Sequence, residues 1–134
     1  MMGSNYIKAY LIITIILASL VISSCSASGS PAETMEKYLQ ALAAKDEVSA
    51  VNHSCADWEE GALAEGASFM TVEVSLEDLQ CQTDTETAGE ATVSCTGKYI
   101  FSYDAGEDQE LDLTGRVFKV IKESDEWRMC GYGK

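Results

Sequence analysis

The segment Met70-Thr-Val-Glu-Val-Ser-Leu76 marks the point where the apolar residues of this chain change their spacing. Before it, apolar side chains recur every three or four residues, which is the period of a helix. Within it, Val72, Val74 and Leu76 alternate with polar residues, which is the period of a strand. The change predicts an α+β domain, with two or three N-terminal helices packed on a curved four-stranded antiparallel sheet.

On the N-terminal side of this segment, the first helix has clear start signals. Ser30 can cap it, Pro31 suits its first turn, and Glu33 completes the pattern of a capping box. Its apolar residues follow at helical spacing and form one stripe. The predicted stripe consists of Met35, Tyr38, Leu39 and Leu42.

Two shorter helices are expected between this helix and the sheet. Asp46 can cap the first, with Val48 and Val51 facing inward. The second can begin at Ser54 or Asp57, and glycines at two positions predict that it is short or broken. Its expected inward residues are Trp58, Ala62, Leu63 and Phe69.

On the C-terminal side, strand patterns continue to the end of the chain. Leu79 and Cys81 are out of phase with the preceding apolar residues, which predicts a bulge near residues 77–78. A second strand is expected over residues 92–103. A third, over residues 111–120, should bend near Gly115, and a fourth should begin at Trp127.

The first residues have the layout of an export signal. An apolar run over residues 10–22 is shorter than the roughly 20 residues that a spanning helix needs. The tetrad Ile22-Ser23-Ser24-Cys25 resembles the bacterial lipobox, in which the cysteine is acylated and cleavage occurs before it. There are two alternatives: ordinary signal peptidase cleaves near Ala27, or the segment remains as an uncleaved anchor.

These features divide the chain into a lipoprotein signal peptide (1–24), a lipidated tether (25–30) and a domain (31–134). We expect Cys25 to hold the exported domain at the outer face of the bacterial cell membrane, or in the outer membrane of a diderm host. The membrane is thus one predicted partner, and a small ligand or an envelope protein is another.

The net charge argues against one class of partner. The 134 residues contain 22 acidic and 9 basic side chains, for a net charge of −13. Such a protein repels phosphate backbones, so nucleic acid is not an expected partner. Apolar residues make up 46% and there is one proline, which is typical of a folded domain.

Four cysteines remain once Cys25 is acylated, and an even number in an oxidising compartment favours disulfides. Cys81 and Cys95 are equally distant from Ala88, where a hairpin can turn, so they can face each other across two strands. This pairing leaves Cys55 with Cys130. A redox role and a metal site are the alternatives, although no CxxC motif is present.

Three residues are weak candidates for proton transfer. The unperturbed pKa of histidine lies near neutrality, so His53 can be a general base, but we favour a polar residue at a helix end because no nucleophile motif surrounds it. Asp57 next to Trp58 can be a carboxylate in an apolar pocket or simply an acid at a helix start. Tyr38 can line a cavity or belong to the core. We expect no cofactor or metal, and the acidic run over residues 104–112 is interpreted as a solvated hairpin tip.

Four segments carry a family resemblance, and they span residues 33–46, 54–59, 92–97 and 126–132. They resemble small bacterial lipoproteins with the cone-shaped, cystatin-like α+β fold of the nuclear transport factor two superfamily. The superfamily contains isomerases, dehydratases, hydrolases and binding modules, so the resemblance implies a fold and leaves two functions open. One is a membrane-tethered binding or interaction module, which we favour. The other is an enzyme that uses the cone cavity.

Overall fold

The computed structural model describes residues 29–134 and contains helices first and strands afterwards. The predicted signal peptide, Cys25 and most of the predicted tether lie outside the described residues. The helices are α2 (Pro31–Ala43), α3 (Glu47–Asn52), the 3-10 helix η1 (Ala56–Trp58) and α4 (Glu59–Phe69). The strands are β1 (Glu73–Glu86), β2 (Glu90–Ser102), β3 (Gln109–Asp112), β4 (Val117–Glu123) and β5 (Glu126–Tyr132). The predicted α+β class is confirmed.

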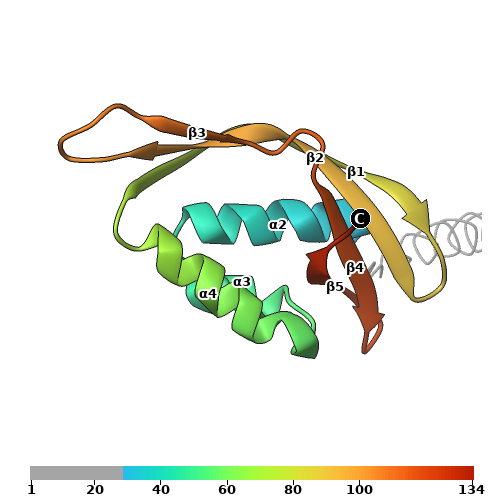
Figure 1. Cartoon of the computed structure of the whole chain (residues 1–134). Helices are drawn as coiled ribbons and strands as arrows, with labels where there is room; N and C mark the ends of the chain where they lie inside the picture. The colour runs from blue at the N-terminus through green and yellow to red at the C-terminus, as the bar shows by residue number, and fades with distance from the viewer. Residues whose placement is uncertain (1–28) are drawn as a thin grey trace, which may run out of the picture.

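A curved antiparallel sheet arches over α2, and α3 and α4 lie on the other side of that helix (Figure 1). The sheet has the order β1-β2-β4-β5, with β3 also paired to β2. The core lies between α2 and the concave face of the sheet. In the described part of the chain, no helix is long and apolar enough to span a membrane.

Helix α2 begins and packs as its sequence predicts, with one difference. The Ser30 hydroxyl accepts a hydrogen bond from the Glu33 backbone N–H at 3.1 Å. The Glu33 side chain does not complete the capping box, because its carboxylate forms an ion pair with Lys37 at 2.7 Å. The residues of the predicted stripe, Met35, Tyr38, Leu39 and Leu42, are all buried.

The two following helices bury most of the residues that were predicted to face inward, but two of these residues are on the surface. Asp46 caps α3 as expected, by accepting a hydrogen bond from Ser49, but Val48 is 72% exposed. Ala50 is buried instead, because the short α3 turns its small residue toward α2 and α4, where a larger side chain would hold the helices apart. Leu63 is likewise on the surface, and α4 continues unbroken to Phe69.

The β1–β2 hairpin has the predicted register. Cys81 is directly opposite Cys95, with their Cα atoms 4.1 Å apart, and the two form a disulfide. The bulge predicted near residues 77–78 is also present, because the register shifts between Glu77 and Gln80. Asp78, within this shift, has a positive φ of 52°. The bulge returns Leu79 and Cys81 to the half-buried face of the strand.

The sheet has five strands where four were predicted, because the third predicted strand is divided into two. Strand β3 pairs with residues 98–101 of β2, and β4 pairs with residues 90–94 of the same edge. Between them the chain makes a turn in which Arg116 N–H bonds to the Leu113 carbonyl, and Gly115 has a φ of +83°. This turn separates the two paired segments, so the bend predicted near Gly115 becomes a complete break.

A second disulfide ties the helical layer to the last strand. Cys55 bonds to Cys130, which is the pairing expected once Cys81 and Cys95 are joined. Two backbone hydrogen bonds flank it, from Cys55 N–H to the Met129 carbonyl at 2.8 Å and from Met129 N–H to the His53 carbonyl at 2.7 Å. The core of the described residues and both disulfides lie within residues 31–132, as expected of a domain that has its own hydrophobic core.

Gly97 is essential to the bulge, and replacing it with alanine should destabilise the domain by about 2 kcal/mol. Its φ is +107°, and a Cβ atom there would lie 2.6 Å from the Glu77 carbonyl oxygen. The measurement is the urea midpoint of unfolding. Gly89→Ala is the matched control, because the same hairpin leaves open space there. Equal midpoints for the two variants would contradict this account of the bulge.

Candidate functional site

A network of polar side chains joins four elements beside the core, α2, η1, α4 and β5. The Tyr38 hydroxyl on α2 donates a hydrogen bond to the Glu65 carboxylate on α4 at 2.6 Å and accepts one from the Trp58 indole N–H at 3.1 Å. The Tyr132 hydroxyl at the end of β5 donates to the other carboxylate oxygen of Glu65. Glu65 therefore links α2, α4 and the last strand through its two oxygens.

The surroundings of these tyrosines keep their hydroxyl groups protonated. Burial raises the pKa of Tyr38 and Tyr132, and the hydrogen bond to the negatively charged Glu65 raises each pKa further. Burial also raises the pKa of Tyr99, whose hydroxyl donates to the Leu39 carbonyl at 2.8 Å. All three tyrosines are consequently hydrogen-bond donors at neutral pH, and none is suited to act as a base.

A cavity of about 200 Å³ lies next to this network, between α4 and the sheet. Helix α4 reaches the sheet through side chains at two points. The Phe69 ring meets the Tyr99 ring at 5.1 Å between centroids, and Glu65 meets Tyr132. The cavity occupies the space between these contacts. It is lined by Leu39, Leu42, Glu65, Phe69, Tyr99, Leu111, Leu113, Arg116, Phe118 and Tyr132.

The chemistry of this lining is apolar with a few polar groups. Leucine and aromatic side chains form most of the wall, and Glu65, Arg116 and the tyrosine hydroxyls supply the polar atoms. Apolar walls with a small number of placed polar groups are typical of sites that bind small molecules. The cavity can therefore hold a compact molecule and orient it, and we regard it as the candidate site.

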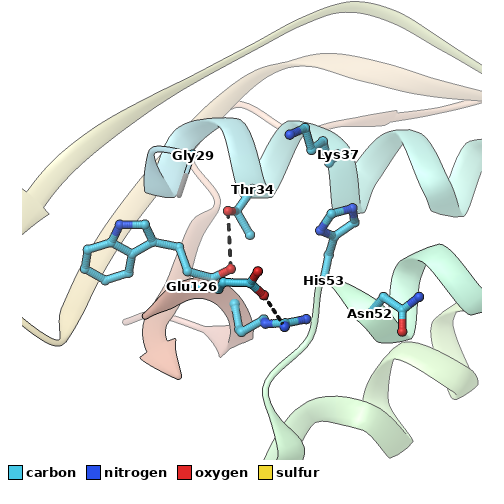
Figure 2. Close-up of a pocket in the computed structure, with 8 residues that line it drawn as sticks. Gly29, Thr34, Lys37, Asn52, His53 and Glu126 are labelled. Carbon is cyan, nitrogen blue, oxygen red and sulfur yellow. Dashed lines mark hydrogen bonds and ion pairs between the residues drawn. The ribbon is translucent and has the colours of Figure 1, made fainter. Parts of the chain in front are cut away.

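His53 lies elsewhere, in an open hollow of about 430 Å³ between α2 and the start of β5 (Figure 2). Burial lowers the pKa of His53, and the positive charges of Lys37 and Arg128 lower it further, so the imidazole is neutral at pH 7. Lys37 is paired with Glu33, and Arg128 is paired with Glu126. Within residues 29–134 the His53 ring forms no hydrogen bond that would orient it as a general base.

The structure does not bring the three proton-transfer candidates together. Asp57 is exposed in the first turn of η1, so it fits the alternative of an acid at a helix start and not that of a carboxylate in an apolar pocket. The reason is that the neighbouring Trp58 turns inward to Tyr38 while Asp57 faces solvent. Tyr38 is fully buried and, like Asp57, lines neither the cavity nor the His53 hollow.

The residues that give the cavity its polarity were not predicted from the sequence. Glu65 has a detectable signal, because it lies at helical spacing between Ala62 and Phe69, which are both buried. An acidic residue on an inward stripe indicates a polar partner inside. Arg116 and Tyr132 have no comparable signal, since their positions depend on the strand break and on the curvature of the sheet.

Two further sequence predictions concern metals and the acidic run. Among residues 29–134, no cluster of three or more His, Cys, Asp or Glu side chains is arranged to hold a metal ion.

The acidic run lies mostly in the connection between β2 and β3, where residues 103–110 are exposed, as a solvated hairpin tip requires.

No protein-family model matches the chain, and no curated protein matches it in sequence. Its fold is similar to that of a SEC-C motif containing protein from Rhodopseudomonas palustris, with a TM-score of 0.50 and 15% identity over 75% of this chain and 74% of that one. It is also similar to an NTF-2 like protein of unknown function from Shewanella oneidensis MR-1, with a TM-score of 0.42 and 13% identity over 72% and 88% of the two chains. Such identities concern the fold alone.

Proposed function

We propose that this protein is an exported, lipid-anchored binding module whose cavity takes a small, largely apolar molecule. The observation that carries the proposal is the cavity itself, which is lined by leucine and aromatic side chains around a hydrogen-bonded carboxylate. We favour a small molecule over an envelope protein as the ligand. The polar atoms of the site line a cavity, and cavities of this kind bind small molecules.

Two features support export. The tetrad at residues 22–25 has the pattern of a lipobox, and both disulfides of the domain belong in an oxidising compartment. We also propose that the domain is a nuclear transport factor two-like module of the cystatin-like type. The support for this assignment is the helix enclosed by a curved antiparallel sheet, together with the motif segments that begin and end the domain.

The enzyme hypothesis has less support than the binding module. It needs convergent titratable groups in the cavity, and the three candidates lie apart. Glu65 remains as a carboxylate at the cavity wall, but both of its oxygens already accept hydrogen bonds from tyrosines. With both oxygens engaged by tyrosine hydroxyls, Glu65 suits contact with a ligand better than proton abstraction.

Blocking the cavity should abolish ligand binding without unfolding the protein. Leu111→Trp places a large side chain in the cavity wall, whereas Leu63→Trp adds the same group on the exposed face of α4. We expect small molecules from a screen to stabilise the parent and Leu63→Trp in thermal unfolding, by about 2.7 kcal/mol at a hundred times the dissociation constant. Leu111→Trp should show no such shift. Ligands that stabilise all three proteins equally would place binding outside the cavity.

A further inference from the structure

We propose that the ligand of the cavity is a small organic cation, an ammonium group on a compact apolar body. This inference rests on the proposed function, since it names the chemical class of molecule that the same cavity binds. The feature that carries it is the Glu65 carboxylate, whose two oxygens accept hydrogen bonds from Tyr38 and Tyr132 and from no other side chain of the described residues. No lysine or arginine of residues 29–134 forms an ion pair with it.

A carboxylate in a partly buried wall is most stable beside a positive charge. Phenol hydroxyls satisfy its hydrogen bonds but leave its charge without a counter-ion. A cationic ligand would supply that charge. An anionic ligand would meet repulsion from Glu65 at the same place, and the net charge of −13 attracts cations to the protein and repels anions.

The aromatic side chains of the cavity favour the same class of ligand. Phe69, Tyr99, Phe118 and Tyr132 all line it, on three different strands and α4. Aromatic rings attract ammonium groups through their negative faces, and cages of such rings recognise quaternary ammonium ligands. The leucines at the other walls suit the apolar body that the ammonium group carries.

The size of the cavity limits the ligand to a few atoms. A volume of about 200 Å³ corresponds to about seven water molecules at liquid density, so it holds a molecule of about seven non-hydrogen atoms. Arg116 is the one cationic residue of the lining, and it is exposed with its Nε bonded to the Asp112 carbonyl. It should therefore oppose a cationic ligand from the rim without neutralising Glu65.

The test compares choline with 3,3-dimethylbutan-1-ol, which has the same shape without the charge. Calorimetry on the domain should give choline at least about tenfold higher affinity than the alcohol. Glu65→Gln should remove this difference, because the amide keeps an acceptor for Tyr38 and loses the charge. Glu60→Gln is the control for net charge, because Glu60 is an exposed acid on the same helix. This variant should leave the difference in affinity between the two molecules unchanged.

A second variant keeps the proposal falsifiable if Glu65→Gln folds poorly. Arg116→Gln is on the surface, and it should raise the affinity for choline because it removes the opposing charge. Equal binding of both molecules, abolished by Leu111→Trp, would overturn the cation inference and leave the proposed function in place. Lower affinity for choline in Arg116→Gln would also overturn it. If neither molecule binds, the inference fails, and the proposed function is then decided by the screen with Leu111→Trp.

Discussion

Replacing Cys55 and Cys130 together by alanine lowers the free energy of unfolding by about 4.5 kcal/mol, the largest stability effect that we expect. The two residues are 75 positions apart, so their bond removes more entropy from the unfolded chain than a short-range disulfide does. The bond also holds the segment after α3 against β5, next to the two backbone hydrogen bonds that join this segment to Met129. Denaturant unfolding under oxidising conditions gives the value.

The Cys81–Cys95 pair is the comparison for this prediction. Its loop spans 14 residues, so alanine at both positions should cost about 3 kcal/mol. The hairpin that it joins is also held by a long ladder of backbone hydrogen bonds and should keep its register. A larger loss from the hairpin pair than from Cys55–Cys130 would show that chain entropy does not set the order.

Cys25→Ala should move the protein out of the membrane fraction or stall its processing. An acylated cysteine anchors a protein stably when it carries two or more chains, and alanine cannot be acylated. Cell fractionation followed by detergent partitioning measures the change. Ser26→Ala, the adjacent substitution, is the control and should leave the protein in the membrane. A Cys25→Ala variant that is processed and located like the parent would rule out the lipoprotein hypothesis.

The sequence predicts those parts of the fold that depend on local periodicity. The α2 stripe follows from helical spacing, and the register of Cys81 with Cys95 follows from their equal distance from Ala88. The bulge near residues 77–78 follows from a change of phase. In each case one short segment contains the whole signal, and no long-range contact is needed to interpret it.

The wrong predictions concern positions where packing between elements decides which of the locally possible structures forms. Val48 has the spacing of an inward residue, but the smaller Ala50 allows α3 a closer approach to its neighbours. Gly115 indicates a bend, yet the complete break between β3 and β4 depends on β2 pairing with both segments. The cavity depends on Glu65 and Tyr132, which are 67 positions apart and meet only in the folded chain.

The most direct test of the proposed function is the methyl NMR spectrum of leucine-labelled domain during titration with choline and with 3,3-dimethylbutan-1-ol. Leu39, Leu42, Leu111 and Leu113 line the cavity, whereas Leu63 and Leu76 do not. If the cavity is the binding site, the methyl resonances of the four lining leucines shift with saturation and those of the other two stay in place. Binding of either molecule with shifts confined to Leu63 or Leu76 would contradict the account.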